Sequence, residues 1–169
     1  VHPCFVPQDH LLSSVNRDLS AVFLRCDNLG ETLQTGAGAG RLPTASAVVA
    51  DLVSLARSTD LGKREALPMG WFNVENSATL VPISETSARY YFRFTSRDAC
   101  GVLAKITGIL AENNISIETI IQKNVKDPGK VSIVVITEKV TDSKASKAVD
   151  AIDALPEIVE KSQTIRFLA

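Results

Sequence analysis

Hydrophobic residues between Arg89 and Leu168 recur with a period that switches between two and about 3.6 residues. The order of the periods predicts strand, helix, strand, strand, helix and strand, joined by short connections. This is the order of a ferredoxin-like βαββαβ domain, which belongs to the α+β class. The strands are expected near residues 89–95, 115–125, 131–137 and 159–167, and the helices near 102–112 and 143–155.

Both predicted helices have one apolar stripe, so both are expected to cover the same face of the sheet. The opposite face is then left with apolar side chains at Tyr91, Ile120, Val134 and Ile136. A sheet face this apolar is usually covered by another surface. A second copy of the chain is the simplest cover, so we expect a homo-oligomer that forms through this sheet.

The first strand-to-helix corner, Ser96–Leu103, has the chemistry of a small-ligand pocket rather than of a catalytic centre. This region offers a carboxylate, helix N-terminal amides and side-chain amides, which suit a small ligand with charged groups. Asp98 is equally explained as a helix cap, and Asn114 as a helix stop.

In the first half of the chain, residues 21–25 and 31–35 predict a β-hairpin. Glycine then occupies alternate positions from Gly36 to Gly40, ahead of a helix over 45–56 that Thr44 is placed to cap. Glycines before a helix N-terminus suit a phosphate. The spacing is nevertheless neither the dinucleotide fingerprint nor a Walker loop, so spacing alone favours a structural loop.

Composition excludes several classes of protein. The net charge is −1 over 169 residues, and 45% of them are hydrophobic, so neither nucleic acid nor a membrane is an expected partner. Cys4, Cys26 and Cys100 match no metal or disulfide spacing, which indicates reduced thiols in a cytoplasm, each a small buried hydrophobe. The histidines, His2 and His10, are expected to be structural, and no metal site is predicted.

The chain opens with Val1-His2-Pro3, and its one methionine is Met69. We therefore expect it to be the C-terminal piece of a longer polypeptide.

Residues 1–57 resemble the end of the catalytic region of bacterial homoserine dehydrogenases. The resemblance is carried by His2-Pro3, Asp9-His10, the glycine loop and the run Pro43–Asp51. It implies that Gly38, Gly40 and Thr44 approach the NAD(P) cofactor of the complete enzyme. The family's proton-transfer lysine, substrate carboxylates and first phosphate loop have no counterpart in this chain, so no residue here is expected to be catalytic. The segment Arg17–Ser20 departs from the family, where a glycine and an asparagine are expected.

Residues 89–169 resemble an ACT domain, a regulatory module of amino-acid biosynthetic enzymes. The matching positions are Asp98–Leu103, Asn114–Ile117 and Gln122, with Cys100 in place of the family's proline. The resemblance implies an amino-acid effector such as threonine, whose ammonium and carboxylate would be complemented at this site. The effector-binding residues that it implies are Asp98, Gly101, Val102, Asn114, Ile115 and Gln122. Residues 58–88 are then a linker.

Two functions are compatible with these features. The first is a regulatory part, inactive by itself, of a cytoplasmic NAD(P)-dependent homoserine dehydrogenase. Such an enzyme interconverts aspartate semialdehyde and homoserine in threonine, methionine and isoleucine biosynthesis. The alternative is a non-enzymatic dimerisation module that binds no ligand.

Overall fold

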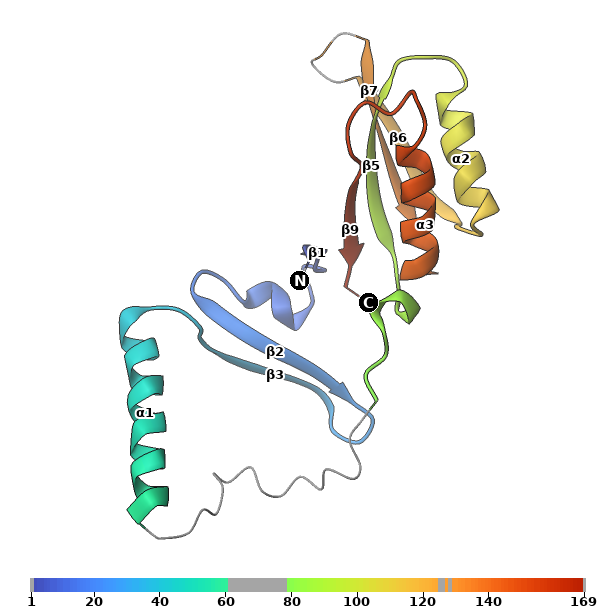
Figure 1. Ribbon diagram of the computed structural model, residues 1–169. Helices are drawn as coiled ribbons and strands as arrows, with labels where there is room; N and C mark the ends of the chain where they lie inside the picture. The colour runs from blue at the N-terminus through green and yellow to red at the C-terminus, as the bar shows by residue number, and fades with distance from the viewer. Residues whose placement is uncertain (1, 61–78, 125–126, 128, 169) are drawn as a thin grey trace. The chain divides into compact units, whose positions relative to one another are not determined.

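The computed structural model describes residues 2–60, 79–124, 127 and 129–168 (Figure 1). Its contacts divide the chain into two units. The first, which we call the sheet unit, combines Val1–Pro7 with Leu80–Ala169. The second, the hairpin unit, is formed by Gln8–Thr79. The predicted linker lies mostly outside the described residues.

The sheet unit contains a five-stranded sheet in the order β1-β9-β5-β7-β6. The pairs β9–β5, β5–β7 and β7–β6 are antiparallel, whereas β1 and β9 are parallel. The predicted βαββαβ order is confirmed, and β1 is an addition that the sequence did not predict. The elements are β1 (Cys4–Phe5), β5 (Tyr90–Arg97), α2 (Val102–Glu112), β6 (Ile117–Asn124), β7 (Lys130–Thr137), α3 (Asp142–Asp153) and β9 (Gln163–Phe167).

The core lies between the sheet and the two helices, which cover the same face (Figure 1). Alternation along β5 buries Tyr90, Phe92 and Phe94, each at most 1% exposed. Ile106 of α2 and Ile152 of α3 pack against them and are fully buried. Two short strands, β4 (Ser87–Ala88) and β8 (Val140–Thr141), pair beside this core. The 3-10 turn η3 (Ile83–Glu85) directly precedes β4.

The face of the sheet away from the helices is apolar, but the predicted position of Ile120 on it is wrong. The β6–β7 register shifts between Ile117 and Thr119, so one extra residue enters β6. Ile120 therefore pairs with buried Val135 on the helix side, and Ile121 takes its place on the open face. On that face, the Phe5 ring of β1 lies 5.5 Å from the Tyr91 ring and 5.2 Å from the Phe167 ring.

The caps of the helices differ from the predictions. Helix α3 begins one residue before the predicted start at 143, with Thr141 as its N-cap and Asp142 as its first residue. Gly101 is the N-cap of α2 and no side chain bonds to that helix end, so Asp98 does not cap it. After α2, Asn114 adopts a positive φ of 55°, which confirms it as a helix stop.

The hairpin unit consists of a 3-10 turn η1 (Leu11–Ser14), the hairpin β2 (Leu19–Cys26) with β3 (Gly30–Ala37), and α1 (Arg41–Asp60). The predicted hairpin is confirmed and extends further at both ends. Helix α1 begins at Arg41, so Thr44 lies in its first turn and is not the cap. The Thr44 amide donates to the Gly40 carbonyl at 3.1 Å.

The three cysteines, Cys4, Cys26 and Cys100, are all exposed, so the prediction of buried thiols is wrong. Each lies at an edge: Cys4 in the outermost strand, Cys26 at a hairpin end and Cys100 in the corner before α2. None of the helices described in the structure is both long and apolar enough to cross a membrane. Within the same residues, no three His, Cys, Asp or Glu side chains gather as a metal site requires.

Candidate ligand site

A cavity of about 280 Å³, which we call the corner cavity, lies where β5 leads into α2. Four of the six predicted effector residues line it. Asp98, Gly101 and Val102 come from the corner itself, and Gln122 comes from β6. Core residues Val131 and Ile133 of β7 also border the cavity. The cavity therefore combines an apolar wall with a carboxylate, an amide side chain and the start of a helix.

Backbone hydrogen bonds fix the course of the chain at this corner. The Arg97 amide donates to the Glu157 carbonyl at 2.9 Å, and the Asp98 amide donates to the Gly129 carbonyl at 2.9 Å. Gly101 then has a φ of +88°, which L residues rarely adopt, and a Cβ there would meet nothing within 4 Å. Glycine is thus required by backbone conformation and not by space. The first amides of α2 have no partner within the helix and remain available to an anion.

Ser96, the last residue of β5 on the core side, was predicted as the start of the corner but not as one of the effector-binding residues. Ser96 is fully buried, lines the corner cavity, and its Oγ has no hydrogen-bond partner in the described structure. The sequence does contain a signal, because Ser96 continues the alternating positions of Tyr90, Phe92 and Phe94 with a polar residue. A polar residue in a core position needs a partner.

Asn114 and Ile115 do not reach the corner cavity. They follow the far end of α2, whose 11 residues span about 16 Å. Asn114 borders a separate hollow with Glu112 and Lys147. Ile115 is 4% exposed and belongs to the core. The six predicted residues therefore do not form one site within a single chain.

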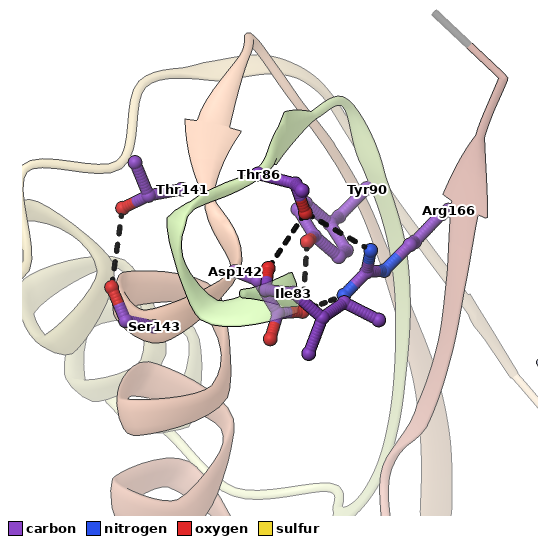
Figure 2. Close-up of polar contacts among 7 residues, drawn as sticks. All are labelled: Ile83, Thr86, Tyr90, Thr141, Asp142, Ser143 and Arg166. Atoms are coloured by element: carbon purple, nitrogen blue, oxygen red, sulfur yellow. Dashed lines mark hydrogen bonds and ion pairs between the residues drawn. The ribbon is translucent and has the colours of Figure 1, made fainter. Parts of the chain in front are cut away.

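A second polar cluster ties together β5, α3, β9 and the segment before β4 (Figure 2). The Tyr90 hydroxyl donates to Asp142 Oδ1 at 3.0 Å, and the Arg166 guanidinium forms an ion pair with the same oxygen. Arg166 Nη1 also donates to Thr86 Oγ1 at 3.4 Å. Burial and the bond to Asp142 raise the pKa of Tyr90 to about 12. This cluster joins four segments and so has a structural role.

The predicted cofactor residues Gly38, Gly40 and Thr44 are neighbours in the loop and first turn ahead of α1. A Cβ on Gly38 would lie 1.9 Å from Ser20 Oγ, and the Gly38 amide donates to the Asp18 carbonyl at 3.0 Å. Close packing on the hairpin therefore explains Gly38 without a cofactor. Gly40, with a φ of +120°, sets the turn into α1.

Comparison with known proteins supplies the family. The model "Homoserine dehydrogenase" matches residues 1–53, and the model "ACT domain" matches residues 90–157. The homoserine dehydrogenase of Neisseria gonorrhoeae is 40% identical over 167 residues, which cover 98% of this chain and 38% of that protein. The chain corresponds to the C-terminal part of homoserine dehydrogenases. This confirms the resemblance seen in the sequence.

Two further homoserine dehydrogenases agree with this assignment. The Pseudomonas aeruginosa protein is 37% identical over 92% of this chain and 36% of its own length. The crystal structure of the Thiobacillus denitrificans homoserine dehydrogenase superposes with a TM-score of 0.75 at 35% identity, covering 99% of this chain and 38% of that one. The chain thus spans less than half the length of these homoserine dehydrogenases.

Proposed function

We propose that this chain is the regulatory C-terminal part of an NAD(P)-dependent homoserine dehydrogenase, and that its ACT domain binds an amino-acid effector, with threonine the first candidate. The observation that carries the proposal is the corner cavity, where Asp98, Gly101, Val102 and Gln122 meet. Asp98 is exposed and available to an ammonium. The amides at the start of α2 are available to a carboxylate.

The size of the cavity limits the ligand. Ligand pockets for drug-sized molecules begin at about 300 Å³. The corner cavity, at about 280 Å³, lies just below that range and suits a single small amino acid. An effector that binds one state of the enzyme better by about 1–3 kcal/mol is enough for feedback control.

We also propose that the chain forms a homo-oligomer through the open face of its sheet. Phe5 and Ile121 are 41% and 42% exposed there, next to the half-buried rings of Tyr91 and Phe167. A contiguous patch of this kind in a water-soluble domain calls for a cover, and a second copy offers the same apolar surface. Within this arrangement Asn114 contributes to an effector site only if the second copy presents it.

The first segment belongs, in this proposal, to the edge of a cofactor site. Gly40 precedes α1 and accepts a hydrogen bond from the Thr44 amide in its first turn, while Gly38 packs against Ser20. The N-terminus of this helix suits a phosphate or amide group. When bound, the nicotinamide would donate a hydride to aspartate semialdehyde in one direction and accept one from homoserine in the other. No catalytic residue is assigned here, so the chain alone should be inactive. The exposed free thiols fit a cytoplasmic enzyme.

Calorimetry of the 169-residue chain tests the effector site. Threonine should produce saturable heat with at most one site per chain, whereas isoleucine and methionine serve as comparison ligands. Asp98→Asn should weaken threonine binding about tenfold, because it removes the charge that meets the ammonium. Asp150→Asn, on the exposed side of α3, is the matched control and should bind as the wild type does.

The same measurement distinguishes the effector site from the alternative, a dimerisation module. No heat at millimolar threonine, together with a concentration-dependent dimer in sedimentation, would favour a dimerisation module without a ligand.

A further inference from the structure

We propose that the Ser96 hydroxyl selects the side chain of the effector, and that the corner cavity is built for short amino acids with a hydroxyl on the β-carbon. The inference deepens the proposed function and rests on it. It starts from one atom: Ser96 Oγ is buried beside the cavity and has no hydrogen-bond partner among the residues that the structure describes.

The surroundings of Ser96 differ from those of the other polar groups in the cavity. Ser96 pairs with Val131 in the sheet and forms a bridge with Ile158. Val131 and Ile133, both lining the cavity, are at most 2% exposed. A hydroxyl buried among apolar neighbours discriminates strongly between ligands that can pair with it and ligands that cannot.

The charged ends of an amino acid have better partners elsewhere in the cavity. Asp98 and Gly101 are exposed, so ammonium and carboxylate bind there without complete loss of hydration. The deep end, formed by Ser96 with Val131 and Ile133, is then left for the side chain. It offers one hydrogen bond and an apolar wall. A β-carbon that carries a hydroxyl and a methyl group matches both.

The test is calorimetry of the 169-residue chain with threonine and with valine, which has nearly the same shape and lacks the hydroxyl. The wild type should bind threonine at least tenfold more tightly than valine, because valine leaves the Ser96 hydroxyl unpaired. Ser96→Ala should lower the affinity for threonine about tenfold and leave that for valine within about threefold. The preference between the two ligands should therefore disappear.

Ser132→Ala is the matched control. Ser132 lies on β7 next to Val131 and Ile133, and its side chain is on the opposite face of the sheet. It should keep the wild-type preference for threonine. Thermal unfolding followed by circular dichroism establishes that both variants are folded before they are compared.

The possible results separate the inference from the function on which it rests. If the wild type binds threonine but Ser96→Ala keeps the same preference over valine, the role of Ser96 is overturned while the effector site stands. Equal affinity of the wild type for threonine and valine would likewise overturn the role of Ser96 and leave the effector site standing. If neither ligand binds the wild type, the effector site and the role of Ser96 both fall.

Discussion

The two units of the chain have equally regular backbones and very different interiors. In the sheet unit, Phe92, Phe94, Ile106 and Leu110 are all fully buried. In the hairpin unit, no residue whose burial is described is buried. Large apolar side chains are exposed on both its hairpin and its helix: Val22 at 58%, Leu24 at 48%, Leu42 at 75%, Val49 at 57% and Leu52 at 60%.

Regular hydrogen-bonded secondary structure is therefore not sufficient for a stable fold. The hairpin of β2 and β3 pairs along its whole length, and α1 has 20 residues. An isolated hairpin is nevertheless marginal in water, and most helical stability comes from packing. The described part of the hairpin unit therefore lacks the buried core that would stabilise it. The sheet unit carries its own core.

A pair of truncations, one in the core and one on an exposed helix surface, gives the sharpest version of this comparison. Phe92→Ala should lower the free energy of unfolding by about 3–5 kcal/mol, because it leaves a cavity between the sheet and both helices. Leu52→Ala on α1 should change it by less than about 0.5 kcal/mol, since that side chain is largely exposed. Urea unfolding followed by circular dichroism measures both. A loss for Leu52→Ala as large as that for Phe92→Ala would contradict the comparison.

The ion pairs of the two units also differ in burial, with a smaller expected effect on the free energy of unfolding. The Arg166–Asp142 pair has side chains only 16% and 24% exposed and also holds the Tyr90 hydroxyl. Asp142→Ala leaves both partners unsatisfied and should lower the free energy of unfolding by about 1–3 kcal/mol. The Arg25–Glu31 pair of the hairpin is 61% and 46% exposed, so Glu31→Ala should cost at most about 0.5 kcal/mol.

The same urea experiment measures these two variants. If Asp142→Ala proved as mild as Glu31→Ala, the cluster around Tyr90 would not hold its four segments together.

Sequence periodicity was enough to predict the sheet unit, and its limits are physical. The alternation along Tyr90–Arg97 and the apolar stripe of α2 reflect which side chains are buried. The pattern therefore predicts the strands, the helices and the sheet face that both helices cover. The bulge in β6 is invisible to a pattern of period two, and it moved Ile120 to the helix side. β1 has two residues and therefore no period, so only the structure reveals its pairing with β9.

The candidate site was predictable where it is continuous in sequence. Asp98, Gly101 and Val102 are neighbours along the chain, and Gln122 lies on a strand beside the corner. Asn114 lies outside the cavity of its own chain because the length of α2 separates the two, and the residues around Asn114 do not reveal that distance. Arg166 and Asp142 are far apart in sequence, and nothing local marks either as the partner of Tyr90.

The smallest expected effect is a dependence on alkaline pH that only the sheet unit should show. The pKa of Tyr90 is about 12 in the folded chain, against an ordinary value of 10.0. Below pH 10 the phenol is protonated in both states. Between pH 10 and 12 the unfolded state loses the proton and the folded state retains it, so stability falls as the pH rises.

Tyr90→Phe should therefore cost about 1 kcal/mol at pH 7, where the bond to Asp142 is lost, and the difference from wild type should narrow above pH 10. Urea unfolding at pH 7, 9, 10 and 11 measures it. Tyr91→Phe, on the open face, retains Tyr90 and so keeps the alkaline loss of the wild type. A difference between wild type and Tyr90→Phe that stayed constant with pH would show that the phenol is not held protonated by burial and Asp142. Burial in the sheet unit would then have no effect on the protonation of the Tyr90 phenol.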